Sequence, residues 1–278
     1  MTSPNSKKKK ASKKKAERKT RSSGKRTYVT PEGNEYPSAT TILQVVNKPA
    51  LVPWAAKQER LWCVEAATEL YELLDQSVKF APLVYQQVLN DKIGFLKKYQ
   101  KELTEAADIG TQVHNRIEWE IKDQLKLNID EVSGERTPVP PLDTIAAQNS
   151  FLRFAQWEQT VMFEPLKVEQ IVWSDTFQYA GTFDWIAMVN GVLTLGDWKT
   201  GKRIYPEVAM QLSSYVMAMV EQRLLKPPIQ GCCVRLPKVE TDPEAEIKLY
   251  SWEELLEAFE AFKACAKLFH WQGGMKGE

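Results

Sequence analysis

The sequence has 278 residues, of which 43% are hydrophobic and 26% charged, and its net charge is +1. This composition is typical of a soluble protein with one large domain or two small ones. No apolar stretch approaches the roughly 20 residues of a membrane span, and no apolar segment near the N-terminus resembles a secretory signal. We therefore expect neither a membrane-spanning helix nor secretion.

The charge is distributed unevenly along the chain. Residues 1–26 hold 12 Lys or Arg and one acid, Glu17, whereas the remainder holds 25 basic and 35 acidic residues. A tail of charge +11 thus precedes a body of charge −10. Because the tail has almost no apolar residues to bury, we expect it to be disordered. Such a polycation can bind nucleic acid or act as a nuclear address, and a mere solubility tail is the alternative.

The folded region is expected to begin at residue 27. Tyr36-Pro-Ser-Ala-Thr-Thr-Ile-Leu43 is typical of a helix start, with Ser38 or Thr40 as N-cap. Hydroxyls at a helix N-terminus can also bind phosphate, so Ser38, Thr40 and Thr41 are candidates for contact with nucleic acid, with capping as the alternative.

Apolar residues at helical spacing predict mostly helix over 53–126, interrupted at Pro82. Residues 128–142 are rich in Pro and Gly and predict a loop, and a helix is expected over 143–160. Strands are then expected at 167–173, 178–189 and 192–199, a helix at 206–225, strands at 229–236 and 245–251, and a helix at 253–270.

This order of elements indicates an α/β fold with a small mixed sheet. We expect residues 27–278 to form a single domain. Its mostly helical N-terminal part covers residues 27–126, and its α/β core covers residues 143–278.

Asn190-Gly191 lies between two apolar runs and predicts a two-residue hairpin turn, since both positions need φ > 0. Residues that face each other across that turn have numbers that sum to 381. Asp184 and Asp197 therefore face each other, with Cβ atoms about 4.5–5.5 Å apart.

The residues that flank this acidic pair are apolar on both faces of the hairpin. Ile186 is expected opposite Leu195, and Phe183 opposite Trp198. Two buried carboxylates persist only if they share a proton or hold a cation, and oxygen ligands suit Mg²⁺ or Mn²⁺.

Lys199 projects from the same face as Asp197. Two acids and a lysine are the groups that metal-assisted phosphodiester hydrolysis uses. The alternative is a strand-end pair of acids near solvent beside a surface lysine.

Other polar residues share helical faces. His114 and Glu118 are four residues apart, so the imidazole could bind a metal and the carboxylate could fix its tautomer. Gln211 and Tyr215 have the same spacing on the helix after Lys199, which must pack back on the sheet. Glu169, on the preceding strand, is a weaker candidate for a supporting role.

The cysteines are Cys63, Cys232, Cys233 and Cys265, with no CxxC pair. Adjacent Cys232 and Cys233 should point to opposite faces of a strand. We expect reduced, buried thiols in a cytoplasmic protein, with a nuclear or organellar location as the alternative.

Four of these segments together resemble a known family. Gly110-Thr-x-x-His114, Gly181-Thr-Phe-Asp184, Asp197-Trp-Lys199 and Gln211-x-x-x-Tyr215 occur in the order of the PD-(D/E)XK nuclease superfamily, in spacing most similar to its RecB-like exonuclease branch. The segment from Tyr36 to Leu43 is similar to the corresponding region of mitochondrial genome maintenance exonucleases and related phage nucleases.

The resemblance implies a restriction-endonuclease-like core with the His114 helix packed on it. It implies that His114, Asp184 and Asp197 bind the metal together with the Trp198 carbonyl, and that Lys199 acts on the attacking water. Gln211 and Tyr215 would support the site. Some members carry an iron–sulfur cluster on four cysteines, but the spacing of the cysteines here does not fit, so we expect no cluster.

These features lead us to expect a Mg²⁺- or Mn²⁺-dependent DNA exonuclease that acts on strand ends or single strands in replication, recombination or repair. Trp54 and Trp62 are candidates for stacking on bases, with a core position as the alternative. A catalytically idle nucleic-acid-binding module is the second hypothesis. A glycosidase with paired carboxylates is the third.

Overall fold

The computed structural model describes residues 15–20, 26–46, 51–73, 82–93, 98–130, 133–242 and 244–273. Its centre is a five-stranded mixed sheet in the order β4-β5-β6-β7-β8. The strands are β4 (Phe163–Ser174), β5 (Tyr179–Val189), β6 (Val192–Lys199), β7 (Gln230–Arg235) and β8 (Glu246–Tyr250). Only β6 and β7 run parallel, and helix α6 (Glu207–Glu221) connects them. The predicted α/β class is confirmed, as is the predicted order of elements in residues 143–278.

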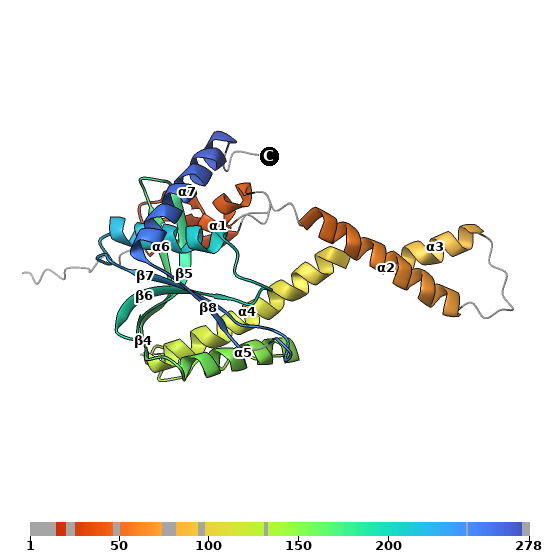
Figure 1. The fold of residues 1–278 in the computed structure, drawn as a ribbon, viewed down its shortest axis with the longest axis horizontal. Helices are drawn as coiled ribbons and strands as arrows, with labels where there is room; N and C mark the ends of the chain where they lie inside the picture. Colours follow the sequence, from red (N-terminus) through yellow and green to blue (C-terminus); the bar gives the residue numbers. More distant parts are fainter. Residues whose placement is uncertain are drawn as a thin grey trace, which may run out of the picture.

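Helices cover both faces of this sheet (Figure 1). One face packs against α6, α7 (Trp252–Trp271) and the short α1 (Ala39–Ile42). The other face packs against α4 (Lys98–Gln124) and α5 (Ile145–Glu158). Adjacent Cys232 and Cys233 are buried and belong to opposite cores, as predicted. The expectation of a buried thiol is wrong for Cys63, which is exposed on α2 (Leu51–Leu73). Within the ranges given above, no helix is both long and apolar enough to cross a bilayer.

The core under α4 and α5 is rich in aromatic rings. Trp198 has its ring centroid 5.1 Å from that of Trp185, 5.2 Å from that of Phe154 and 5.3 Å from that of Trp157. Such tilted and edge-on pairs stabilise a core beyond the area that they bury. They anchor Trp198, the residue of β6 (Val192–Lys199) that lies between Asp197 and Lys199 in the sequence.

A second, three-stranded sheet precedes α1. It consists of β1 (Glu17–Thr20), β2 (Arg26–Val29) and β3 (Glu35–Pro37), and 3-10 helix η1 (Leu43–Val45) follows α1. The expected disorder of residues 1–26 is therefore wrong for Glu17–Thr20, because pairing with β2 satisfies this strand's backbone. Residues 1–14 and 21–25 lie outside the described residues. The hydroxyls of Tyr28 and Thr182 lie 3.1 Å apart and join this sheet to β5.

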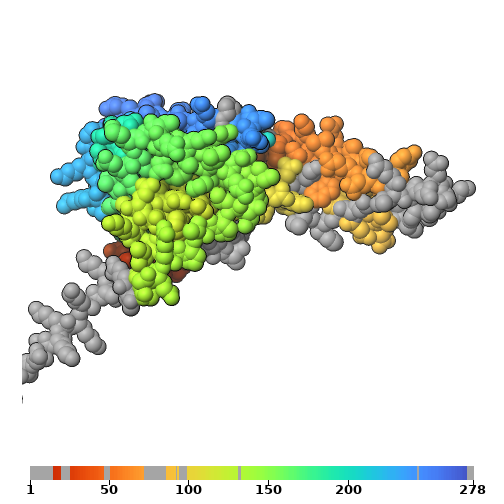
Figure 2. Space-filling view, turned by 90° about the horizontal axis from the view of Figure 1, so that it is seen from below, coloured from red at the N-terminus to blue at the C-terminus, as the bar shows by residue number. Residues whose placement is uncertain are grey.

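Helices α2 (Leu51–Leu73) and α3 (Pro82–Ile93) extend away from the sheet as an arm, together with the first turns of α4 (Figures 1 and 2). The predicted helical region is thus confirmed for residues 51–73, 82–93 and 98–124. Pro82 begins α3, in the position where a missing N–H costs nothing. The predicted loop after α4 contains one isolated bridge, between Ile129 and Arg136.

The alternation of side chains along β4 and β5 breaks at Glu169 and Asp184. The strand pairing passes from Val168–Trp185 to Gln170–Phe183 without this pair, and Glu169 has φ 46°. As a result Phe183 packs under α6 and α7, whereas Trp198 packs under α4 and α5. The expectation that Phe183 and Trp198 share one face is wrong because of this irregularity.

Gly196 allows Trp185 to lie flat across the neighbouring strand. A Cβ atom at residue 196 would lie 1.8 Å from Cζ2 of the Trp185 ring, which is itself fully buried. We predict that Gly196→Ala lowers the free energy of unfolding by about 1–3 kcal/mol, since the packed ring must move. Gly201→Ala is the matched control, because its nearest contact would be 3.9 Å away. Thermal unfolding of both variants measures the difference, and equal melting temperatures would contradict the prediction.

Candidate metal and phosphodiester site

The predicted turn sets the register of the central hairpin. Asn190 and Gly191 have φ values of 49° and 78°, and the strand pairs run from Val189–Val192 to Trp185–Gly196. Each pair sums to 381, so the predicted register is confirmed. The ladder stops one pair short of Asp184 and Asp197. At that point Asp184 Oδ2 instead accepts a hydrogen bond of 2.7 Å from the Trp198 backbone N–H.

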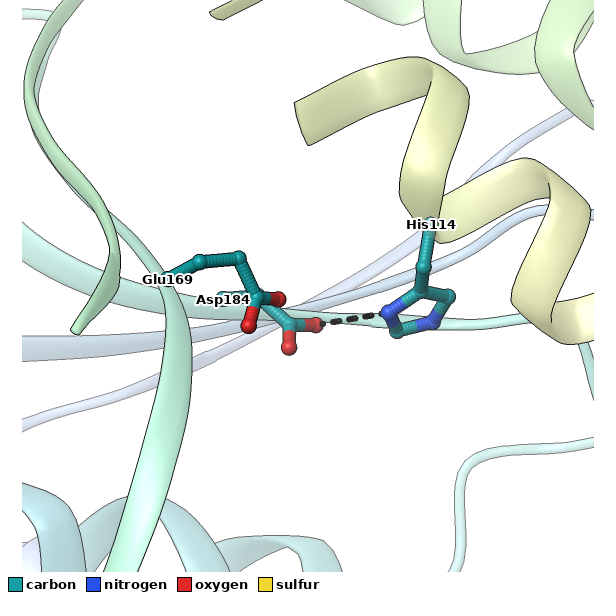
Figure 3. Close-up of side chains that lie close together, drawn as sticks. All are labelled: His114, Glu169 and Asp184. Atoms are coloured by element: carbon teal, nitrogen blue, oxygen red, sulfur yellow. Dashed lines mark ion pairs between the residues drawn. The ribbon is translucent and has the colours of Figure 1, made fainter. Parts of the chain in front are cut away.

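Three side chains from three elements converge at the end of the ladder. His114 from α4, Glu169 from β4 and Asp184 from β5 each offer a ligand atom, and these atoms all lie within 4.8 Å of one another. His114 Nδ1 is 3.5 Å from Asp184 Oδ2 (Figure 3). The figure shows the Glu169 and Asp184 carboxylates side by side, with the imidazole opposite them. One nitrogen and two carboxylates suit Mn²⁺ and are compatible with Mg²⁺.

The electrostatics of this group favour protonation when no cation is present. Burial raises the pKa of Glu169 to about 8, and the Asp184 and Glu118 carboxylates add to the shift. Burial also raises the pKa of Asp184 to about 6, with the nearby imidazole of His114 opposing it. Two carboxylates that resist ionisation beside each other are the arrangement that a divalent cation would relieve.

The expected facing pair of Asp184 and Asp197 is not formed as a strand pair, because the alternation of β5 breaks at Asp184. Asp197 instead lies in a separate hydrogen-bonded network on the α6 side of the sheet. Its Oδ1 accepts hydrogen bonds from Lys199 Nζ and Gln211 Nε2, each 2.9 Å long. Gln211 Oε1 also accepts from Lys199 Nζ at 3.1 Å, and Gln211 Nε2 lies 3.3 Å from the Tyr215 hydroxyl. The predicted face of Gln211 and Tyr215 on α6 therefore does meet Asp197 and Lys199.

This network keeps a charge deep in the protein. The side chain of Asp197 is 3% exposed, and its Oδ2 lies 2.7 Å from Lys199 Nζ but accepts no well-aligned hydrogen bond. Burial lowers the pKa of Lys199, but the Asp197 and Asp184 carboxylates outweigh burial and raise this pKa overall. Lys199 thus stays protonated beside Asp197.

Tyr215 reaches this network because Gly181 has no side chain. A Cβ atom at residue 181 would lie 2.3 Å from Cε1 of the Tyr215 ring. The glycine of the Gly181-Thr-Phe-Asp184 segment therefore has a packing role, three residues before the aspartate.

Glu118 lies near the site but does not pair with His114. It forms an ion pair with Lys122 on the next turn of α4, and its charge contributes to the raised pKa of Glu169. The carboxylate that faces the His114 ring is that of Asp184. The expectation that Glu118 fixes the tautomer of His114 is therefore wrong.

Ser38 caps α1, as predicted. Its Oγ accepts a hydrogen bond of 2.9 Å from the Thr41 N–H, and its hydroxyl lies 2.7 Å from that of Thr41. Both side chains are buried, so neither hydroxyl is open to a nucleic acid from solvent. Thr40 is half-buried and lines a pocket that also contains Lys199 and Gln211.

The predicted aromatic platform on the arm is acidic. Trp54 and Trp62 are both half-buried. Trp62 lines a cavity of about 550 Å³ between α2 and α4, whose remaining lining residues are Glu65, Ala66, Glu69, Lys101, Glu102 and Glu105. Four carboxylates beside one lysine disfavour a phosphate backbone, so this cavity does not support base stacking on Trp62.

Glu169 is the site residue that sequence reasoning undervalued. Ser174 pairs with Tyr179 across the β4–β5 turn, so facing residues in this hairpin have numbers that sum to 353. Residue 169 is then opposite residue 184. The arithmetic that paired Asp184 with Asp197 would have found Glu169 if it had been applied to the preceding hairpin as well.

No protein-family model and no curated protein matches the sequence. Among solved structures, the chain is similar to the crystal structure of a candidate exonuclease from Eubacterium rectale. The sequences are 14% identical, the TM-score is 0.40, and the similarity covers 62% of this chain and 69% of that one. A likeness of this size carries no argument about function.

The raised pKa of Glu169 predicts a pH-dependent stability of the metal-free protein. The pKa of an unfolded Glu lies near 4.5, whereas burial raises the pKa of Glu169 to about 8. The folded state therefore binds more protons between these values, and stability falls as pH rises through this window. We predict that Glu169→Gln is more stable than the wild type at pH 8 by at least about 1 kcal/mol, since one pKa unit corresponds to about 1.4 kcal/mol.

Thermal unfolding in EDTA at pH 5 and pH 8 measures this effect. Glu164→Gln is the control, because residue 164 lies on the same strand and is exposed. If Glu169→Gln and Glu164→Gln respond equally to pH, residue 169 does not carry the effect. Added Mn²⁺ should stabilise the wild type at pH 8 more than it stabilises Glu169→Gln.

Proposed function

We propose that this protein is a divalent-metal-dependent deoxyribonuclease of the PD-(D/E)XK type, with a restriction-endonuclease-like core. The observation that carries the proposal is the junction of two groups at one end of the β5–β6 hairpin. His114, Glu169 and Asp184 offer converging ligand atoms, and the buried Asp197–Lys199 pair lies on the adjacent strand.

The proposed metal ligands are His114, Asp184 and Asp197, with Glu169 added. Asp197 would contribute Oδ2, the buried oxygen without a well-aligned hydrogen bond. When bound, Mg²⁺ or Mn²⁺ would lower the pKa of an attacking water and neutralise charge on the scissile phosphate.

The protein's own groups have distinct roles in this proposal. Protonated Lys199 donates hydrogen bonds toward negative charge that develops on the phosphate. Gln211 orients both Lys199 and Asp197, since it bonds to each of them. Tyr215 in turn fixes the Gln211 amide. A lysine that is held by Asp197 and the Gln211 amide is pre-oriented, so little reorganisation is needed when substrate binds.

The charge distribution favours a strand end or a single strand as substrate. The body has a net charge of −10, and the cavity on the arm is lined by carboxylates. Tight binding to a long duplex needs many cationic contacts, which such a surface does not offer. A single strand that enters the site needs only a few local contacts. We therefore propose exonuclease activity in DNA replication, recombination or repair.

A cleavage assay with end-labelled single-stranded DNA and Mg²⁺ or Mn²⁺ tests the function. We expect Asp197→Asn and Lys199→Ala each to lower the rate by at least about 100-fold, the scale on which loss of one charge-stabilising group acts. Asp143→Asn is the control, because residue 143 is an exposed aspartate on the loop before α5. Calorimetry should show Mn²⁺ binding to the wild type that Asp184→Asn weakens.

Two results would contradict the proposal. Wild-type protein that binds DNA without cleaving it under either metal would be an idle binding module. Cleavage that survives in both Asp197→Asn and Lys199→Ala would place the chemistry elsewhere.

The basic N-terminal segment is proposed to hold DNA rather than to cleave it. Residues 1–14 contain six lysines (Lys7, Lys8, Lys9, Lys10, Lys13 and Lys14) and no acid. We predict that deleting residues 1–14, which leaves β1 intact, weakens DNA binding and flattens its dependence on salt by up to about 0.7 per lost phosphate contact. Affinity measured between 50 and 200 mM NaCl gives the slope. An unchanged slope would show that this segment does not contact DNA.

A further inference from the structure

A second pocket adjoins the proposed site. It has a volume of about 340 Å³ and is lined by Thr40, Gln44, Lys199, Arg203, Tyr205 and Gln211, among others. Lys199 and Gln211 are the same side chains that bond to Asp197. The pocket is therefore continuous with the network that we assign to the scissile phosphate. Its volume is at the lower end of the range of about 300–1,000 Å³ that holds small ligands.

The loop between β6 and α6 forms one wall of this pocket. It places the Arg203 guanidinium 4.7 Å from the centroid of the Tyr205 ring. Tyr205 is 41% exposed, and Arg203 is exposed as well. The two side chains thus form a stacked cationic and aromatic unit that solvent reaches, directly after the strand that carries Lys199.

Such a unit suits one nucleotide. Bases stack on aromatic rings whatever their sequence, and guanidinium groups bind phosphate through paired hydrogen bonds. Glu207 also lines the pocket, and its negative charge would repel a second phosphate beside it. The lining therefore combines one stacking surface, one arginine and the lysine of the proposed site, which matches a single unit of a strand better than a duplex.

We propose that this pocket holds the nucleotide next to the scissile phosphate, with its base on Tyr205 and its flanking phosphate on Arg203. The assignment rests on the proposed nuclease function and extends it to the position of the strand. A nucleotide with any base can make this contact, since stacking on Tyr205 does not depend on the DNA sequence. Arg203 and Tyr205 are binding residues in this view, and the chemical step belongs to Lys199 and the acids.

Binding of a fluorescein-labelled oligothymidylate in EDTA tests the pocket without cleavage. Loss of one stacked base corresponds to about 1–3 kcal/mol, so Tyr205→Ala should weaken binding by roughly 5- to 150-fold. Tyr205→Phe keeps the ring and should stay within about twofold of the wild type. Arg203→Ala should lower the slope of log affinity against log salt by about 0.7, since one phosphate contact is lost.

Tyr71→Ala is the matched control, because Tyr71 is 77% exposed and lies in the last turn of α2. In cleavage assays, Tyr205→Ala should raise KM by a similar factor, with kcat within about threefold. If Tyr205→Ala binds as tightly as Tyr71→Ala, or if Arg203→Ala leaves the salt slope unchanged, the pocket assignment is wrong.

The binding assay separates this assignment from the proposed function. If the wild type cleaves DNA while Tyr205→Ala binds normally, only the pocket assignment fails. If the Tyr205 and Arg203 variants bind as expected while the wild type cleaves nothing, the nuclease proposal fails and the pocket stands as a nucleic-acid site.

Discussion

The tight turn at Asn190 and Gly191 determines which side chains of β5 and β6 meet, and the arrangement of the site follows from it. Both residues adopt positive φ, and the pairs extend without a slip to Trp185 and Gly196. A slip of one residue would exchange the two faces of a strand. Asp197 would then turn away from α6, and Lys199 would turn with it. The hydrogen bond from the Trp198 N–H to Asp184 joins the two strands where their ladder ends.

This register brings several charges into the interior, which is costly unless each finds a partner. Asp197 has found its partners in Lys199 and Gln211. Asp184 accepts a hydrogen bond from the Trp198 N–H and lies near the His114 imidazole, yet burial still raises its pKa to about 6. Burial raises the pKa of Glu169 to about 8, and the charge of Asp184 adds to this shift. A cation that binds only the folded protein would offset this cost and raise stability by mass action. Stability and metal affinity are therefore linked through the same carboxylates.

Much of the fold could be predicted because its signals are local. The Asn-Gly turn and the apolar, β-branched runs beside it predicted the strands of the central sheet, β4 to β8. The helical spacing of apolar residues predicted α4 to α7. The face of Phe183 could not be predicted in the same way. It depends on the positive φ of Glu169, a conformation that glutamate seldom adopts and that no neighbouring residue signals. The strands β1, β2 and β3 were missed because their pairing with one another, rather than their local composition, decides their conformation.

The irregularity at Glu169 is itself informative about the site. A non-glycine residue with positive φ costs about 1–3 kcal/mol, and such residues persist where the surrounding structure over-determines them. Here the strained residue also carries a buried carboxylate, and it faces the aspartate at the end of the hairpin. A regular strand would avoid the strain. Glu169 and Asp184 would then form an ordinary strand pair. The break instead lets three ligand atoms from α4, β4 and β5 converge. Backbone strain and a buried carboxylate thus coincide at Glu169. This coincidence supports the binding site that we propose.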